Sequence, residues 1–297
     1  MEATARELKA LLGPRARFAQ PLKRYTTWRV GGEGWCVAVV HNKAELQGVV
    51  ELAVSSGLPW RILGRGSNVL ALDEGFPGVV IVMRGEMAKV CTSPEGLVCG
   101  GGASLARVVR VAAEAGLKGL EWAAGIPASV GGAAVTNAGA YGGEMAKVIK
   151  KIEVYVPGEG SRHIKALPGG YRTRQVPHGA VVTQVWLGLK PSSPAQTRAE
   201  RQQMLLRRRS TQPLSQPTAG CVFKNPPGEA AGRLIEACGL KGTRIGGAKV
   251  SEIHANFIVN TAEAKASEIL ELMELVATAV REQFGVELEP EVEVLRW

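Results

Sequence analysis

Residues 125–143 read GIPASVGGAAVTNAGAYGG, and this stretch decides how the rest of the chain is read. More than half of it is glycine or alanine, with one proline and no charged residue. Glycine destabilises the interior of helices and strands, so neither element suits this composition. Glycine also lets another group come close to the bare backbone. The stretch therefore predicts a loop that lies at contact distance from another group.

Two further glycine loops precede this stretch, LGRGSN at 63–68 and CGGGAS at 99–104. Each follows a strand-like run, so each could direct backbone N–H groups toward a phosphate. Both lack the third glycine of a Rossmann fingerprint, and the chain has no GxxxxGK[ST] motif. A single loop of this kind is usually only a turn. Three within about 80 residues favour a dinucleotide held by a fold other than the Rossmann fold.

The apolar patterns between the loops predict both helices and strands. Helices are expected at 42–57, 104–116 and 228–239, and the longest helix is expected to open at Thr261 and end at Gly285. Short β-branched runs predict strands at 37–40, 60–64, 79–82, 152–156, 180–189, 257–260 and within 286–297. The order shows no strict alternation of strand and helix, so the fold class is predicted to be α+β. The Pro-rich tract KPSSP at 190–194 is interpreted as a linker.

Length and composition set broad limits. A chain of 297 residues is long enough for two domains. No run of eighteen apolar residues is present, so no membrane span is expected, and the first residues do not resemble a signal peptide. The five cysteines lack CxxC spacing and the four histidines are scattered, which predicts reduced thiols, a cytoplasmic protein and no metal site.

The net charge of +9 suggests an anionic partner. Nucleic acid is not expected, because aromatic residues make up only 5% of the chain and no DNA-binding motif is present. Much of the positive charge lies in one run, RAERQQMLLRRRS at 198–210. Two interpretations stay open for this run: a solvated helix face, or a rim that binds phosphate.

Seven motifs in the same chain order resemble those of one enzyme family. They are YTTWRVGG (25–32), LGRGSN (63–68), GIPASVGGAAVTNAGAYGGE (125–144), YRTR (171–174), PTAGCVFKNP (217–226), HANFIVN (254–260) and LEPEVEV (288–294). Together they resemble the UDP-N-acetylenolpyruvoylglucosamine reductase (MurB) family of bacterial cell-wall synthesis. The similarity runs from about residue 20 to the C-terminus. The short connection after YRTR resembles the shorter subclass of the family, which lacks an extra loop over the substrate.

The resemblance implies a two-domain flavoenzyme. An FAD-binding domain of the vanillyl-alcohol-oxidase (PCMH) type would span 20–190, in two lobes split near residue 70. A C-terminal α+β domain at 195–297 would bind the substrate. Non-covalent FAD would pass a hydride from NADPH to the enolpyruvyl ether of UDP-N-acetylenolpyruvoylglucosamine, giving UDP-N-acetylmuramate for peptidoglycan. A cytoplasmic monomer is expected, because the resemblance implies no partner other than the two substrates.

The resemblance also assigns binding residues. For FAD they are Leu63, Gly64, Arg65, Gly66, Ser67, Asn68, Gly125, Ile126, Pro127, Ser129, Val130, Gly131, Gly132, Ala133, Asn137, Gly139 and Ala140. For the UDP-sugar they are Tyr141, Arg207, Arg208, Lys224, Asn225 and Asn256. Lys224 could instead serve the nicotinamide side. His254 is interpreted as a structural histidine, because nothing in the chemistry requires it.

The reaction explains why three further residues are expected to be catalytic. Hydride attack on an enolpyruvyl ether leaves negative charge on the carbon that bears the carboxylate, so the site needs a cation there and an acid. By resemblance, Arg172 contacts the carboxylate and Glu291, held protonated, donates to the enolate. Cys221 occupies the position of the proton donor, which in the family is more often serine. A thiol has an ordinary pKa near 8.5, so it is protonated at neutral pH and more acidic than a hydroxyl.

A non-catalytic role remains an alternative for each of the three residues. Cys221 could be a small buried hydrophobe, Arg172 part of a structural ion pair, and Glu291 a solvated charge. Because Glu291 lies among other glutamates, a register error of two residues is also open. For the whole chain, the alternatives are another flavin oxidoreductase of this fold and a nucleotide-sugar binding protein without turnover. Neither alternative needs Arg172, Cys221 and Glu291 together.

Overall fold

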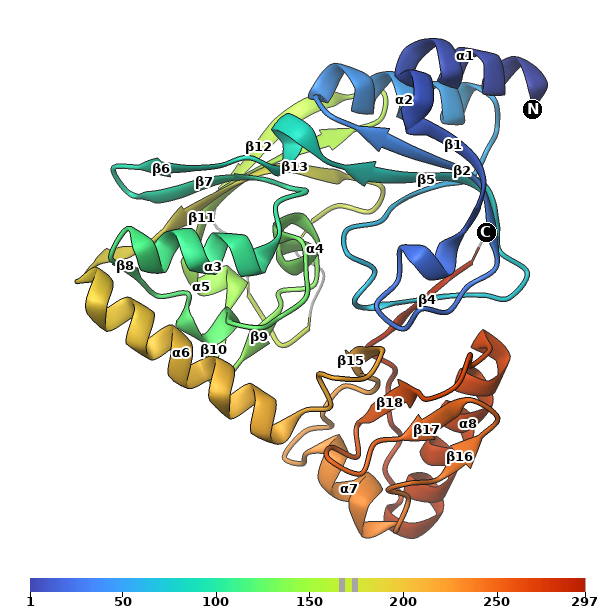
Figure 1. The fold of residues 1–297 in the computed structure, drawn as a ribbon, viewed down its shortest axis with the longest axis vertical. Coiled ribbons are helices and arrows are strands. Elements are labelled where there is room, and N and C mark those ends of the chain that lie inside the picture. Colours follow the sequence, from blue (N-terminus) through green and yellow to red (C-terminus); the bar gives the residue numbers. More distant parts are fainter. Residues whose placement is uncertain (166–168, 173–175, 297) are drawn as a thin grey trace. The chain divides into compact units, whose positions relative to one another are not determined.

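The chain forms two units in this computed structural model, which describes residues 1–165, 169–172 and 176–296 (Figure 1). The first unit comprises Met1–Phe18, Cys36–Arg65 and Gly78–Arg208. The second comprises Ala19–Trp35, Gly66–Pro77 and Arg209–Trp297. Helices and strands mix in both units, which confirms the α+β prediction. The assignment of FAD to 20–190 and of the substrate to 195–297 stays a prediction.

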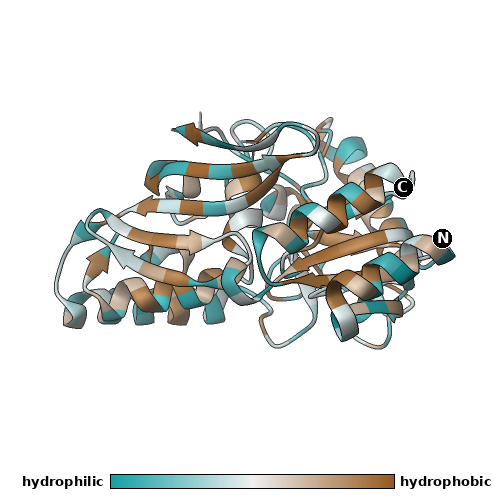
Figure 2. Cartoon of the chain, turned by 90° about the horizontal axis from the view of Figure 1, so that it is seen from above, coloured by the Kyte–Doolittle hydropathy of each residue, from teal (hydrophilic) through white to brown (hydrophobic). Residues whose placement is uncertain are grey.

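A four-stranded sheet opens the fold, in the order β1-β2-β5-β3. Its strands are β1 (Ala16–Pro21), β2 (Glu33–Val40), β5 (Phe76–Met83) and β3 (Trp60–Ile62). Helices α1 (Glu2–Leu12) and α2 (Lys43–Ser55) contact each other beside it. Strands β2 and β5 are almost wholly buried, as their unbroken apolar runs predict. Several strands are accordingly hydrophobic along their length, whereas the helices carry hydrophobic and hydrophilic stripes (Figure 2).

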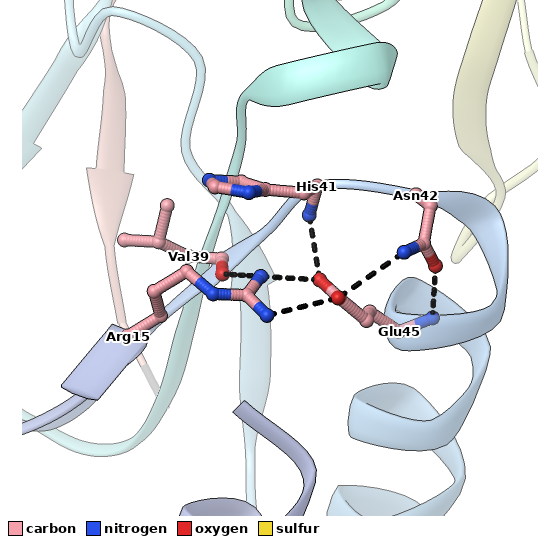
Figure 3. Close-up of polar contacts among 5 residues, drawn as sticks. All are labelled: Arg15, Val39, His41, Asn42 and Glu45. Carbon is pink, nitrogen blue, oxygen red and sulfur yellow. Dashed lines mark hydrogen bonds and ion pairs between the residues drawn. The ribbon is translucent and has the colours of Figure 1, made fainter. Parts of the chain in front are cut away.

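Helix α2 begins where the sequence predicts, because its cap is local. The side chain of Asn42 accepts a hydrogen bond from the Glu45 N–H at 2.9 Å, and Glu45 accepts one from the His41 N–H at 2.8 Å. Figure 3 shows that Arg15 adds a forked contact to the same carboxylate, including an Nη2–Oε1 distance of 2.9 Å. This hydrogen bond from Arg15, with help from the His41 N–H, lowers the pKa of Glu45 to about 2.

We expect Glu45 to contribute stability that depends on pH. A carboxyl pKa lowered on folding stabilises the native state above the unfolded pKa of about 4.3, and that contribution is lost as the pH falls through about 2. Glu45→Gln should therefore lower the free energy of unfolding by on the order of 1–3 kcal/mol at pH 7. The difference from wild type should shrink between pH 5 and pH 2.

Urea unfolding at several pH values measures this effect. Glu114→Gln is a matched control, because Glu114 is exposed on helix α3 and its pair with Arg110 is long, at 4.0 Å. The free energy of unfolding of Glu45→Gln could instead stay below that of wild type by the same amount from pH 7 to pH 3. That result would show that the lost stability does not come from the ionised carboxylate.

A second sheet forms the larger part of the first unit, in the order β12-β11-β13-β7-β6. Its strands are β12 (Gly160–Lys165), β11 (Ile149–Val156), β13 (Val181–Gly188), β7 (Gly96–Gly100) and β6 (Val90–Ser93), and every pairing is antiparallel. Helices α3 (Leu105–Glu114) and α4 (Val130–Val135) share a buried apolar core with β7, β11 and β13. The glycine loop 99–104 leads from β7 into α3, so this core holds it in place.

Shorter elements complete the first unit. They are β8 (Leu117–Lys118), which pairs with β14 (Lys190–Pro191), β9 (Gly139–Ala140), which pairs with β10 (Gly143–Glu144), and helices α5 (Met145–Val148) and α6 (Pro194–Thr211). The interpretation of 190–194 as a linker is wrong in part, because the tract forms strand β14 and the start of α6. Within the described residues, 3-10 helices lie at Gly13–Arg15, Gly85–Ala88 and Glu121–Ala123 in this unit and at Leu22–Arg24 in the second unit.

The second unit has its own sheet and core. The sheet runs β15 (Thr218–Cys221), β18 (Phe257–Asn260), β17 (Ala248–Val250) and β16 (Arg244–Ile245), and helices α7 (Ala231–Ala237) and α8 (Ala266–Phe284) contact each other beside it. Strand β4 (Val69–Ala71) pairs in parallel with β19 (Glu293–Leu295). Trp28 is fully buried in this core and donates its indole N–H to the Ile258 carbonyl at 2.7 Å. The YTTWRVGG motif therefore anchors its own segment, Ala19–Trp35, in the second unit.

Helix α8 begins at Ala266, so the prediction that it opens at Thr261 is wrong. Its first N–H groups are capped by Asp73, whose carboxylate accepts from the N–H of Ala266 at 2.8 Å and of Ser267 at 3.0 Å. These hydrogen bonds keep the pKa of Asp73 below its ordinary value even though partial burial raises it. The hydroxyl of Thr261 instead bonds the Gly247 carbonyl.

Candidate active site

The three glycine loops meet through residues of the first unit, which contains 63–65, 99–104 and 125–143. Loop 99–104 and the start of 125–143 are joined by backbone hydrogen bonds from Val130 to Ala103 and from Gly131 to Gly101, both of 2.8 Å. Loop 63–68 joins them at Gly64, where a Cβ would come within 2.2 Å of the Ser129 hydroxyl. Residues distant in sequence are thus packed backbone to backbone.

Much of the glycine in 125–143 is required by atoms of the protein itself. A Cβ at Gly143 would lie 2.2 Å from the Trp122 ring, and one at Gly131 would lie 2.9 Å from the Gly101 carbonyl. At Gly142 a Cβ would meet nothing within 4 Å, and at Gly132 only the Ser129 hydroxyl at 3.1 Å. Gly132 and Gly142 are also exposed, so a ligand has room to approach the backbone at these two positions.

Loop 63–68 carries the backbone donors that suit a phosphate. Within the described chain, the N–H groups of Gly64, Arg65, Gly66 and Ser67 donate to no protein acceptor. The N–H groups at 130–132, which open helix α4, donate instead to Ala103, Gly101 and the Ser129 hydroxyl. Consecutive unpaired N–H groups are the arrangement that binds pyrophosphate oxygens. The loop 63–68 therefore fits the phosphates of a dinucleotide.

The remaining residues predicted for FAD divide by exposure. Buried ones, which can offer only backbone, are Leu63, Gly66, Ser129, Val130, Gly131, Ala133 and Asn137. Partly or fully exposed ones are Gly64, Arg65, Ser67, Asn68, Gly125, Ile126, Pro127, Gly132, Gly139 and Ala140. Their roles toward FAD stay predictions.

Asn137 ties the glycine stretch to the segment that carries Arg172. Its amide accepts from the Ala146 N–H at 2.8 Å and donates to the Gly170 carbonyl at 2.8 Å. Arg172 in turn donates from Nη2 to the Gly139 carbonyl at 3.1 Å. Asn137 and Arg172 both have positive φ, 46° and 51°, which costs non-glycine residues about 1–3 kcal/mol. Thr173 and Arg174 of the YRTR motif lie outside the described residues.

Tyr141 lies against the two arginines predicted for the diphosphate. The guanidinium carbon of Arg207 is 4.5 Å from the centroid of its ring, and that of Arg208 is 5.3 Å. Arg208 is buried and donates from Nε to the Ala124 carbonyl at 2.9 Å, and its side chain fills the space beside Gly125. Arg207 is exposed, so it is the member of the pair that is accessible to an anion.

The hydroxyl of Tyr141 is buried without a hydrogen-bond partner among the described residues. Buried polar groups are nearly always paired, and an exception at a candidate site indicates a group that a ligand completes. Tyr141 also has a positive φ of 51°, a strain typical of functional positions. Both observations agree with its predicted role toward the substrate.

In the second unit, the segments of Cys221 and Glu291 lie side by side. The Glu291 N–H donates to the Val222 carbonyl at 2.8 Å, and Phe223 forms an isolated β-bridge with Pro290. Cys221 ends strand β15, and both Cys221 and Glu291 are half-buried. The motifs PTAGCVFKNP and LEPEVEV are therefore two neighbouring segments of one local structure.

The other residues predicted for the substrate in this unit have protein partners. Asn256 is buried, and its amide accepts from the Phe223 N–H at 3.0 Å and donates to the Phe223 carbonyl at 2.8 Å. Asn225 accepts from the Ala231 N–H at 3.0 Å, at the start of helix α7. Lys224 forms an ion pair with Glu289. Asn256 and Asn225 thus stabilise the fold around the Cys221 segment, and their substrate contacts stay predictions.

Comparisons with known proteins agree with this arrangement. Residues 35–163 match the family described as FAD binding domain, and residues 212–295 match the UDP-N-acetylenolpyruvoylglucosamine reductase, C-terminal domain. The chain is 44% identical to UDP-N-acetylenolpyruvoylglucosamine reductase 2 of Symbiobacterium thermophilum, over 99% of this chain and 97% of the relative. It is 43% identical to the reductase of Moorella thermoacetica, over 99% and 98%. The chain belongs to the UDP-N-acetylenolpyruvoylglucosamine reductase family.

A solved structure confirms the fold of this reductase. The MurB crystal structure from Thermus caldophilus superposes with a TM-score of 0.82 at 41% identity, covering 93% of this chain and 98% of that one. The FAD-binding match includes all three glycine loops, so the chain is an FAD-dependent oxidoreductase. The C-terminal match includes both Cys221 and Glu291. The family assignment removes both whole-chain alternatives.

Other side chains of the reductase fit structural roles. Burial raises the pKa of Cys36 and Cys99 to about 12, so these thiols stay protonated and unreactive. Burial lowers the pKa of His254, whose Nδ1 accepts from the Asn256 N–H at 3.3 Å, as expected for a structural histidine. Within the described residues, no His, Cys, Asp and Glu side chains cluster as metal ligands, and no helix has the length and apolar character to span a membrane.

Sequence reasoning missed two contacts that loop side chains make with distant backbone. Asn68 is predicted to bind FAD, which stays a prediction, and its side chain donates to the Glu291 carbonyl at 3.0 Å. Asp73 lies in no motif, although it caps helix α8. Asparagine and aspartate at loop positions often bond backbone groups, but sequence alone does not show which backbone they reach.

Proposed function

We propose that the chain reduces the enolpyruvyl ether of UDP-N-acetylenolpyruvoylglucosamine with NADPH, giving UDP-N-acetylmuramate. The observation that carries the proposal is the pairing of the Cys221 and Glu291 segments within the family's C-terminal domain. A thiol and a carboxyl on adjacent segments supply the two acidic groups that this reaction needs. We further propose residues 20–190 as the FAD-binding domain and 195–297 as the substrate-binding domain.

The glycine loops fit FAD, because loop 63–68 offers unpaired N–H groups and Gly132 and Gly142 leave open backbone. FAD, when bound, supplies hydride transfer from NADPH to the terminal enolpyruvyl carbon. Loop 63–68 would bind the pyrophosphate through its amides. The short side chains of 125–143 would allow the ring system to approach the backbone.

The acids of the second unit complete the addition of hydrogen across the double bond. After hydride arrives at the terminal carbon, the electron pair of the double bond lies on the carbon beside the carboxylate. Cys221 gives its proton to that carbon, which forms the C–H bond and leaves a thiolate that solvent reprotonates. Glu291 donates a hydrogen bond to the enolate oxygen, and Arg172 balances the charge of the carboxylate. The product is a saturated lactyl ether.

For the UDP part, the proposal assigns cations and donors within each unit separately. Arg207 is exposed and stacks on Tyr141, so it can contact a diphosphate oxygen without losing that support. Arg208 is assigned to the same subsite, with its Nε retained by the Ala124 carbonyl. The proposal also assigns Lys224, Asn225 and Asn256 to the substrate. These side chains would donate hydrogen bonds to it in addition to their contacts with the protein.

An anaerobic titration tests the proposal. The protein should purify yellow and release FAD on denaturation. NADPH should bleach it, and only the enolpyruvyl UDP-sugar should restore the colour rapidly. A colourless protein that ignores added FAD, or reduced protein that is reoxidised equally by unrelated alkenes, would refute it.

Tyr141→Phe should raise KM for the UDP-sugar about tenfold, because a ligand partner of the hydroxyl is lost. The same change should leave the free protein as stable or more stable, since the buried hydroxyl has no partner there. Steady-state kinetics and thermal unfolding together measure both effects. Tyr155→Phe is the matched control, because the Tyr155 hydroxyl bonds Glu51 at 3.4 Å. A destabilised Tyr141→Phe protein with unchanged KM would assign the hydroxyl to the fold alone.

A further inference from the structure

Asn68, the last residue of the loop 63–68, contacts the segment of Glu291 at two points. Its side-chain Nδ2 donates to the Glu291 carbonyl at 3.0 Å. Its backbone carbonyl accepts from the Glu293 N–H at 3.0 Å. Directly after Asn68, strand β4 pairs in parallel with β19, in a register that sets Val69 opposite Glu293. Asn68 therefore extends this pairing backward by one residue, with its side chain supplying the donor for Glu291.

Glu291 is consequently held from both sides. Its N–H is bound by the Val222 carbonyl at 2.8 Å, and its carbonyl is bound by Asn68. With both backbone polar groups engaged, the peptide plane on each side of the residue has little freedom to rotate. The direction in which the carboxyl leaves the backbone is fixed in turn.

The Cys221 segment is fixed by an equivalent contact on its other side. Asn256 bonds both the N–H and the carbonyl of Phe223, and its own carbonyl accepts from the Val222 N–H at 2.9 Å. The order across this part of the unit is Asn68, Glu291, Val222–Phe223, Asn256. Two asparagine side chains thus stand at the two ends of a continuous set of hydrogen bonds that contains Glu291 and the two residues that follow Cys221.

We propose that Asn68 is a positioning residue for Glu291, acting through the backbone of that residue. The proposal rests on the proposed function, in which Glu291 donates to the enolate. Loop 63–68 then has two tasks: its N–H groups face the cofactor, and its last side chain sets the acid. Displacing a catalytic acid by about 1 Å lowers the rate by up to about 10²-fold. The hydrogen bond from Asn68 to the Glu291 carbonyl should therefore affect the rate.

Asn68→Ala and Asn68→Asp test this assignment. Both remove the donor to the Glu291 carbonyl, and aspartate keeps the size of the side chain. Stopped-flow absorbance should show flavin reduction by NADPH near wild type, and reoxidation by the enolpyruvyl UDP-sugar slower by about 10- to 100-fold. Flavin content should be unchanged.

A second measurement does not need the reaction. Amide hydrogen exchange across residues 289–294, in flavin-free protein, should be faster in both Asn68 variants than in wild type. Both variants lack the side-chain hydrogen bond that holds this segment. Asn260→Ala is the matched control. Asn260 also braces backbone in the second unit, donating to the Trp28 carbonyl and accepting from the Ala264 N–H, both at 3.0 Å. The Asn260→Ala protein should lose stability, with flavin reoxidation and amide hydrogen exchange at 289–294 unchanged.

The outcomes separate the alternatives. Unchanged exchange at 289–294 with unchanged reoxidation overturns the proposal. Loss of flavin, with both half-reactions slowed, also overturns it and returns Asn68 to the cofactor site. A similar slowing in Asn260→Ala would show a general effect of stability and would overturn it as well. Wild-type protein that ignores the enolpyruvyl UDP-sugar would refute the proposed function, while exchange would still decide whether Asn68 holds Glu291.

Discussion

Cys221→Ala should slow reoxidation of the reduced flavin by the enolpyruvyl UDP-sugar by about 10²–10⁴-fold, the usual contribution of a positioned general acid. Flavin reduction by NADPH should stay near wild type, because hydride transfer needs no proton from this residue. Stopped-flow absorbance, one half-reaction at a time, separates the two steps. Few single substitutions in this chain are expected to have a larger effect.

The local structure explains why the effect should be confined to one step. Cys221 ends strand β15, where it pairs with Phe257 of β18, and the residues after it are held by Asn256. Because none of these contacts uses the Cys221 thiol, they survive its removal. The half-buried side chain contributes little to the core, so alanine should leave the fold intact.

Two further variants make this prediction sharper. Cys221→Ser should retain much of the activity, since a hydroxyl occupies the same place and serine is the commoner residue of the family at this position. Cys238→Ala is the matched control, because Cys238 is a second half-buried cysteine, at the end of helix α7. Equal slowing of both half-reactions in Cys221→Ala would mean that the residue shapes the site. No slowing would mean that it only packs.

The elements that sequence predicted correctly are those with local signals. Helix α2 begins with its own Asn42 and Glu45, so four consecutive residues contain both partners of this cap. Helix α8 is different, because its first N–H groups bond Asp73, almost two hundred residues earlier in the chain. Its local cap is the Glu268 carboxylate, which accepts from the Lys265 N–H at 3.0 Å, but no Ser, Thr, Asp or Asn occupies the N-cap, so the sequence pattern places the start at Thr261. The contact from Asp73 is one that only the tertiary structure creates.

The glycine stretch shows the same limit at the site. Its composition predicts close approach correctly, but the prediction of a loop without regular structure is wrong, because Val130–Val135 form helix α4. The composition also does not tell which glycines pack against protein and which leave the backbone open. Gly143 is required by Trp122 and Gly131 by Gly101, whereas Gly132 and Gly142 are open. The motif also places Asn68 with the flavin loop, although its side chain reaches Glu291. Motif matching predicts which residues belong to the site, and the structure shows which of them already bond other parts of the protein.

Glu291→Gln should also slow reoxidation by about 10²–10⁴-fold at neutral pH and leave flavin reduction near wild type. Glutamine keeps the size of the side chain and can still donate a hydrogen bond, but it has no acidic proton to share with the enolate. The backbone bonds of residue 291 to Val222 and Asn68 do not involve the carboxyl, so the segment should stay in place. Stopped-flow measurements of both half-reactions and FAD retention check these expectations.

The neighbouring glutamates decide whether the register is correct. Alternate residues of an extended segment point to the same side, so Glu289 and Glu293 are the rivals of Glu291 for its role. Glu289 is exposed and paired with Lys224, and Glu293 is exposed at the start of β19, whereas Glu291 is half-buried beside Val222. Among these three glutamates, Glu291 is the half-buried one, so the proposal assigns the role to it. Glu293→Gln should therefore reoxidise at the wild-type rate, and a slow Glu293→Gln protein beside a normal Glu291→Gln protein would move the acid by two residues.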